Sequence, residues 1–125
     1  MSDKKITILY LDDEENNLNS FKAAFRRDYN IFTTTTAQEA VKVLSDHTVH
    51  VVISDQKMPN ISGVEFFELI VQDFPDPIRM LLTGYADIEA VIDAINKGQV
   101  YRYIGKPWNE TELKMNIENA YEVYT

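Results

Sequence analysis

Short apolar runs rich in β-branched residues alternate with amphipathic segments along the chain. The runs predict β-strands at residues 6–11, 31–35, 50–54, 78–82 and 100–104. After each run, apolar side chains recur every three or four positions, which is typical of a helix that buries one face. Five strands that alternate with five helices predict βαβ units, and therefore an α/β fold in which helices cover both faces of a mainly parallel sheet.

Capping and stop signals mark several helix ends. Residues 36–39 and 62–65 each place a hydroxyl three positions before a glutamate, which is the spacing of a capping box. The proline-rich segment 75–77 should end the third helix near Phe74, and Gly98 is placed to end the fourth. These signals leave only short turns between the elements, so we expect no linker within the chain.

Length and composition favour one globular domain. The chain has 125 residues, of which 45% are hydrophobic and 26% are charged, enough for one well-packed core. We therefore expect residues 1–125 to form a single domain. The formal net charge of −8 argues against direct binding of this domain to nucleic acid or to anionic lipid.

Cysteine usage and the first residues favour a cytoplasmic protein. The chain has no cysteine, which excludes disulfides and cysteine-based metal or redox sites. The first dozen residues lack the long apolar segment of a signal peptide, and no apolar run is long enough to span a bilayer. We therefore expect a cytoplasmic location and no association with a membrane.

Polar side chains follow four of the predicted strands. Asp12 and Asp13 follow the first, Asp55 the third, Thr83 the fourth and Lys106 the fifth. Asp55 comes after a continuous β-branched run, as expected of a strand buried on both faces. Ligands of open parallel sheets bind at the carboxyl ends of the strands, so these side chains should converge there.

This set of side chains suits phosphoryl transfer. Three carboxylates in one place repel one another, and a divalent cation that prefers oxygen ligands, such as Mg²⁺, relieves the repulsion. A carboxylate can also attack phosphorus and form an acyl phosphate. Lys106 and Thr83 are suited to hold phosphoryl oxygens, by charge and by hydroxyl donation. The set therefore predicts phosphoryl transfer onto Asp55.

Five motifs in order resemble one family. They are Asp12-Asp13, Ser54-Asp55-Gln56-Lys57-Met58-Pro59, Ser62-Gly63-Val64-Glu65, Leu82-Thr83-Gly84-Tyr85 and Tyr103-Ile104-Gly105-Lys106-Pro107-Trp108. Together they resemble the receiver domain of bacterial two-component response regulators, over about residues 5–121. The resemblance implies a doubly wound, flavodoxin-like fold of five βα units, with a five-stranded parallel sheet in the order 2-1-3-4-5.

The resemblance also implies a phosphoacceptor and a metal site. Asp55 would receive the phosphoryl group. Asp13, Asp55 and the backbone carbonyl of Lys57 would bind Mg²⁺, and Asp12 would lie nearby and orient water bound to the metal. Lys57 also occupies a position that influences how long the acyl phosphate survives in this family.

Further roles implied by the resemblance lie after the fourth and fifth strands. Thr83 would bond to the phosphoryl group and move toward it, and Tyr103 would turn inward when Thr83 moves. Lys106 would pair with a phosphoryl oxygen, and its bond to Pro107 is expected to be cis, which an X-Pro bond tolerates at low cost. Tyr85 is a second position that influences the lifetime of the acyl phosphate.

The partners follow from the same resemblance. The phosphoryl donor would be a histidine kinase or a phosphotransfer protein, and a fused or separate output domain would respond. The C-terminal motif is similar to receivers of hydrogenase-type transcription regulators and of cyclic-nucleotide or cyclic-dinucleotide enzymes. Apolar residues near the last helix could support a homodimer. Such a domain is a switch that catalyses only its own phosphorylation and dephosphorylation.

Two other functions fit part of the pattern. A Mg²⁺-dependent phosphohydrolase with an aspartyl intermediate would use similar groups. Haloacid-dehalogenase-like enzymes, however, carry Asp-x-Asp after the first strand, whereas Asp12 and Asp13 are adjacent. A docking module with a receiver fold would not use phosphate at all. Taken singly, Asp55 could cap a turn, Thr83 could be a turn hydroxyl, and Lys106 could be a solvated surface residue.

Overall fold

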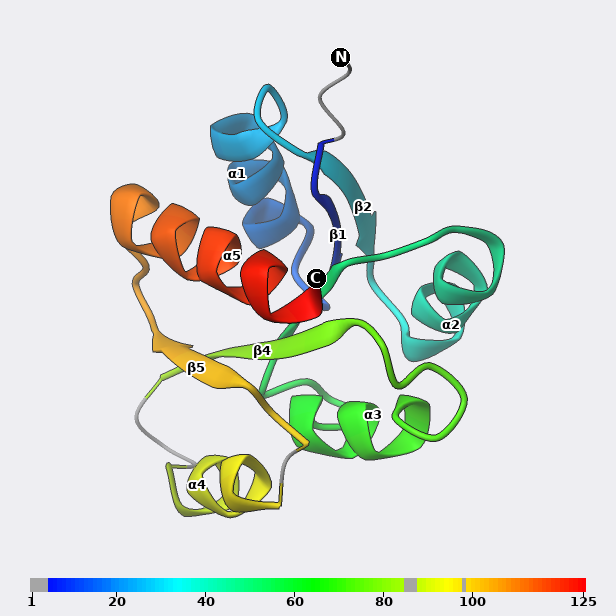
Figure 1. Ribbon diagram of the computed structural model, residues 1–125. Coiled ribbons are helices and arrows are strands. Elements are labelled where there is room, and N and C mark those ends of the chain that lie inside the picture. Colours follow the sequence, from blue (N-terminus) through cyan, green and yellow to red (C-terminus); the bar gives the residue numbers. More distant parts are fainter. Residues whose placement is uncertain (1–4, 85–87, 98) are drawn as a thin grey trace.

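The computed structural model describes residues 5–84, 88–97 and 99–125 (Figure 1). Its strands are β1 Thr7–Leu11, β2 Asn30–Thr34, β3 Val51–Asp55, β4 Ile78–Thr83 and β5 Arg102–Gly105. Within the described residues they form one parallel sheet of five strands in the order β2-β1-β3-β4-β5. The predicted flavodoxin-like fold and strand order are confirmed. Tyr85 and Gly98, for which the sequence predicts roles, lie outside the described residues.

Helices alternate with the strands and cover both faces of the sheet. They are α1 Glu15–Phe25, α2 Ala37–Asp46, α3 Gly63–Ile70, α4 Ile88–Asn96 and α5 Glu110–Tyr124. One face is covered by α1 and α5, and the other by α2, α3 and α4 (Figure 1). Each face has its own apolar cluster, because successive strand residues point to opposite sides. No helix in the described ranges has both the length and the apolar character needed to cross a bilayer.

Two element boundaries differ from the sequence prediction by more than one residue. Helix α3 ends at Ile70 rather than near Phe74, although the Phe74 amide still donates to the Ile70 carbonyl at 2.8 Å in the following turn. Strand β5 begins at Arg102, two residues later than predicted. The Tyr101 amide already donates to the Arg79 carbonyl of β4 at 2.8 Å, and the Gln99 carbonyl accepts from Arg79 Nε at 2.8 Å, so the chain is bonded to β4 just before the paired strand begins.

The capping box predicted at the start of α2 forms only in part. The Thr36 hydroxyl accepts from the Glu39 amide at 3.2 Å, as predicted. The Glu39 carboxylate accepts instead from the amide and the hydroxyl of Thr35, at 3.1 and 3.2 Å. A capping box requires that carboxylate to bond to the N-cap amide, so α2 begins with a hydroxyl cap alone.

Strand β3 lies at the centre of the sheet and is buried on both faces. It pairs with β1 and β4, and all five of its residues are buried. Val51 and Ile53 pack on the side of α1 and α5, whereas Val52 packs on the opposite side. Asp55 is the last residue of the strand and pairs in register with Leu82 of β4. A strand that is hydrogen-bonded along both sides thus carries this carboxylate to the edge of the sheet.

Hydrogen bonds of Gln56 fix the loop that follows β3. The Gln56 amide donates to the Leu82 carbonyl at 3.0 Å, and the Gln56 carbonyl accepts from the Gly63 amide at 3.0 Å. The Gln56 side-chain oxygen accepts from the Val64 amide at 2.9 Å. The capping box predicted at residues 62–65 is present in full. The start of α3 is therefore held against the end of β3.

We expect Gly63→Ala to destabilise the protein. A Cβ at this position would lie 2.5 Å from Leu81 Cδ2 and 2.7 Å from the Asp55 carbonyl oxygen, closer than such atoms pack. The resulting strain should lower the free energy of unfolding by about 1–3 kcal/mol, measured by urea denaturation. Gly105→Ala is the control, because open space surrounds the added carbon there. Equal stability of the two variants would contradict the close packing at Gly63.

Candidate functional site

Three carboxylates lie together at the carboxyl edge of the sheet. Asp12 and Asp13 directly follow β1, and Asp55 ends β3. The two strands are neighbours, with Leu11 opposite Ser54, so the residues that follow them meet. One carboxylate oxygen from each acid lies within 4.8 Å of the others. The structure thus brings together the three acids that the sequence predicts to converge.

Lys106 and Thr83 lie at the same edge. Lys106 Nζ forms an ion pair with Asp55 Oδ1. The Lys106 amide donates to the Thr83 carbonyl at 2.9 Å, which fixes the residue after β5 against the end of β4. Thr83 is only 4% exposed, and its hydroxyl donates to the Gly84 carbonyl at 2.9 Å. The Lys106–Pro107 peptide bond is cis, as predicted.

Opposing effects act on the ionisation of Asp55. Burial is the largest effect and raises the pKa of its carboxyl group above the ordinary value. The hydrogen bond and the positive charge of Lys106 lower that pKa, whereas the negative charges of Asp12 and Asp13 raise it. The net effect is a raised pKa of the Asp55 carboxyl group, and the pairing with Lys106 limits that rise.

The donor set fits a hard divalent cation. Asp12 and Asp55 are buried, whereas Asp13 is exposed, so the acids are open to solvent on the side of Asp13. Lys57 lies in the loop after β3, and its side chain is exposed. Mg²⁺ prefers carboxylate and carbonyl oxygens and retains several waters, which a cluster with one open side allows. The residues present are therefore suited to hold Mg²⁺.

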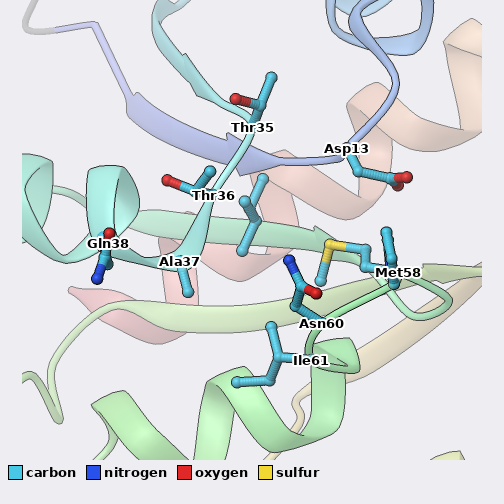
Figure 2. Close-up of a pocket in the computed structure, with 10 residues that line it drawn as sticks. Asp13, Thr35, Thr36, Ala37, Gln38, Met58, Asn60 and Ile61 are labelled. Carbon is cyan, nitrogen blue, oxygen red and sulfur yellow. The ribbon is translucent and has the colours of Figure 1, made fainter.

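A groove of about 400 Å³ opens beside Asp13. It lies between the segment that leads from β2 into α2 and the loop that follows β3 (Figure 2). Thr35 and Thr36 line one side, Met58 and Ile61 line the other, and Asp13 stands at its end (Figure 2). The groove gives solvent and small molecules a path to the exposed acid of the cluster.

Thr83 and Tyr103 lie on adjacent strands and on the same face of the sheet. Leu82 of β4 and Ile104 of β5 are paired in register, and both pack in the cluster beneath α1 and α5. Since side chains alternate along a strand, Thr83 and Tyr103 lie on the opposite face, the side of α3 and α4. Tyr103 is 40% exposed, so space around its ring is open to solvent. Their role as a switch stays a prediction.

Sequence reasoning missed the residues that hold Asp12. The Tyr10 hydroxyl donates to Asp12 Oδ2 at 2.8 Å, and Asn17 Nδ2 donates to the same oxygen at 3.1 Å. The Glu14 amide donates to Asp12 Oδ1 at 2.9 Å. The sequence did contain one indication of this contact: residues two apart on a strand share a face, so Tyr10 is expected beside Asp12. Within an apolar run, however, a tyrosine resembles an ordinary core residue.

Comparison with known sequences identifies relatives over nearly the whole chain. A family model described as the response regulator receiver domain matches residues 8–118. The hydrogenase transcriptional regulatory protein HoxA of Bradyrhizobium diazoefficiens is 35% identical over 118 residues, which make up 94% of this chain and 24% of that protein. The chain thus spans about a quarter of the length of this relative.

Solved structures share the fold. A response regulator receiver domain protein from Clostridium thermocellum has a TM-score of 0.88 and 29% sequence identity, and the match covers 94% of this chain and 95% of that one. The beryllofluoride-activated NtrC4 receiver domain dimer has a TM-score of 0.86 and 30% identity, with 95% and 98% covered. The motifs, the strand order and the acidic site agree with these matches, and the chain belongs to the response regulator receiver domain family.

Proposed function

We propose that this receiver domain accepts a phosphoryl group on Asp55 from the phosphohistidine of a histidine kinase or a phosphotransfer protein. The observation that carries the proposal is the position of Asp55, a buried carboxylate that is paired with Lys106 and lies beside Asp12 and Asp13. As a receiver, the domain is a signalling module rather than a classical enzyme. We further propose that residues 1–125 form one such domain in the cytoplasm, with its core at about 5–121.

Asp13, Asp55 and the backbone carbonyl of Lys57 would hold Mg²⁺, and Asp12 would orient a water bound to it. When bound, Mg²⁺ supplies positive charge that offsets the repulsion among the acids and the charge of the phosphoryl oxygens. The closeness of the three carboxylates supports this assignment. The exposure of Asp13 at the groove supports entry of the ion from that side.

The transfer itself would be an attack by an Asp55 oxygen on the phosphorus of the donor. A P–O bond forms as the P–N bond of phosphohistidine breaks, and the electron pair leaves with the imidazole nitrogen. Negative charge then resides on the phosphoryl oxygens instead of on the Asp55 carboxylate. Lys106 and the Thr83 hydroxyl would then bond to the phosphoryl oxygens, because both already lie at this edge and can donate hydrogen bonds.

The response would reach the surface formed by α4, β5 and α5. Thr83 would exchange its bond to the Gly84 carbonyl for one to the phosphoryl group, and the exposed Tyr103 would turn inward. Relatives such as HoxA are about four times as long as the matched region, which supports a fused or separate output domain as the part that receives the signal. Similarity to an activated receiver dimer supports a homodimer as one response. The net charge of −8 supports the proposal that any contact with nucleic acid would be made by the output domain rather than by this one.

Mg²⁺ and a small phosphodonor such as acetyl phosphate should add one phosphoryl group to the protein, detected by intact-mass spectrometry. Asp55→Asn should abolish the addition, because it removes the nucleophilic oxygen. Lys106→Met should slow it about 100-fold, because it removes the cation that stabilises the charge in transfer. Asp93→Asn is the control, since Asp93 is an exposed carboxylate on α4 that pairs with Lys97.

Two outcomes would contradict the proposal: an unmodified wild-type mass, or a phosphoryl group retained by Asp55→Asn. Repeated turnover of an added phosphomonoester would favour the phosphohydrolase instead. Partner binding that is unaffected by phosphorylation would favour a docking module.

Mg²⁺ should raise the free energy of unfolding, by about 2.7 kcal/mol at a hundredfold excess over its Kd. Asp13→Asn should lose most of that gain, because one of the three carboxylates is removed. Asp93→Asn should keep it. Urea denaturation at matched ionic strength measures the effect, because salt alone screens an acidic protein. An equal gain in Asp13→Asn would exclude that residue as a ligand.

Thr83→Ala should separate phosphorylation from the response of Tyr103. Asp55 would still be modified, but the hydroxyl that couples the phosphoryl group to β5 would be missing. In the wild-type protein, phosphorylation should lower the reactivity of Tyr103 toward tetranitromethane, measured by peptide mass spectrometry; in Thr83→Ala it should not. Thr48→Ala is the control, because this exposed threonine precedes β3 at the opposite edge of the sheet. Protection of Tyr103 in Thr83→Ala would refute the coupling.

A further inference from the structure

Tyr10 carries a polar group into the middle of the apolar core. It lies on β1 and is 1% exposed, in the cluster covered by α1 and α5. Its ring packs edge-on against Phe21, with centroids 4.9 Å apart and an interplanar angle of 62°. A hydroxyl at such a place is unfavourable unless it has a hydrogen-bond partner. Its partner is the Asp12 carboxylate, at 2.8 Å.

The bonds to Asp12 leave it with little remaining capacity to accept. A carboxylate has two acceptor positions on each oxygen. Oδ2 accepts from Tyr10 and Asn17, and Oδ1 accepts from the Glu14 amide. Among the residues that the structure describes, these three bonds leave one acceptor position of the Asp12 carboxylate open, and it lies on Oδ1. Asp12 is thus hydrogen-bonded to a core residue, to a side chain of α1 and to a backbone amide, and one acceptor position is left to face the metal site.

We infer that Tyr10 is a positioning residue: its buried hydroxyl sets the orientation of Asp12 before Mg²⁺ binds and so raises the affinity of the site for that ion. The inference deepens the proposed function and rests on its assignment of Mg²⁺ to these acids. Asp12 would orient water bound to the metal, and the loss of outer partners that orient a metal site commonly weakens metal binding 10- to 100-fold.

The environment of Tyr10 keeps its hydroxyl a donor. Burial, followed by the charge of Asp12, raises the pKa of the phenol above its ordinary value. The ring is held by Phe21 and by the strand, so the hydroxyl has little freedom to turn away. The packing of the core therefore holds the Tyr10 hydroxyl against Asp12.

Tyr10→Phe removes the hydroxyl and keeps the ring that fills the core. Tyr29→Phe is a matched control at a distance from the acids. Tyr29 is 3% exposed, its ring packs on Phe25, and its hydroxyl donates to Glu118 Oε2 at 2.7 Å. Both variants thus lose a buried tyrosine hydroxyl that is bonded to a carboxylate, but only one of these carboxylates belongs to the site.

Calorimetric titration with Mg²⁺ should show a Kd about tenfold higher in Tyr10→Phe than in the wild-type protein, and an unchanged Kd in Tyr29→Phe. At saturating Mg²⁺, the rate of phosphorylation of Tyr10→Phe should return to near the wild-type rate, because only the assembly of the site is impaired. A wild-type Mg²⁺ affinity in Tyr10→Phe, or an equal loss in Tyr29→Phe, would overturn the inference.

A measurement without metal separates this inference from the proposed function. If Tyr10 positions Asp12, its loss should loosen the bond between Asp12 and the Glu14 amide, and hydrogen exchange at that amide should become faster in Tyr10→Phe. Unchanged exchange would overturn the positioning role. Failure of the wild-type protein to bind Mg²⁺ would instead overturn the proposed metal site, whatever the exchange shows.

A second variant keeps the test decisive if Tyr10→Phe does not fold. Asn17→Ala removes the other donor to Asp12 Oδ2 from a partly exposed position on α1. It should also weaken Mg²⁺ binding and speed exchange at the Glu14 amide. Wild-type values for both would show that the orientation of Asp12 does not depend on its Oδ2 donors, which overturns the inference.

Discussion

Crowding of negative charge at one edge of the sheet is the constraint on which the rest of this domain depends. Asp12, Asp13 and Asp55 place carboxylate oxygens within 4.8 Å of one another, and two of the three side chains are buried. Repulsion between such charges is stronger there than in water. Lys106 offsets part of it through its pair with Asp55, and a divalent cation would offset more. The same crowding that opposes folding therefore favours the binding of a cation.

Parallel topology is what makes this crowding possible. In a parallel sheet every strand ends at the same edge, so residues far apart in the chain meet without long loops. β3 is central and hydrogen-bonded on both sides, and Gln56 ties the loop after it to β4 and to α3. Gly63 lets α3 start in contact with Asp55, since a side chain there would overlap the strand. Asp55 thus lies where both neighbouring strands and the start of α3 constrain the backbone.

Less constrained residues connect the site to the surface. Lys106 and Thr83 contact each other through the backbone, and Thr83 shares a face of the sheet with Tyr103 on the neighbouring strand. Tyr103 lies on an edge strand and is 40% exposed, so its ring can change position without disturbing the core. Asp12 is held from the opposite side by Tyr10, whose contacts lie in the core. The site is therefore bonded to the buried core at one end, whereas Tyr103 lies at the exposed edge of the sheet.

The sequence by itself determined the elements, the α/β class and the residues that end the strands, because periodicities of two and of 3.6 residues report locally which face a side chain buries. The motifs added the strand order through a family resemblance. Only the tertiary structure decided where α3 ends and where β5 begins, that the Glu39 carboxylate bonds to Thr35, and that Tyr10 bonds to Asp12. Each of these depends on which atoms packing brings within hydrogen-bonding distance, and a local pattern carries no information about that distance.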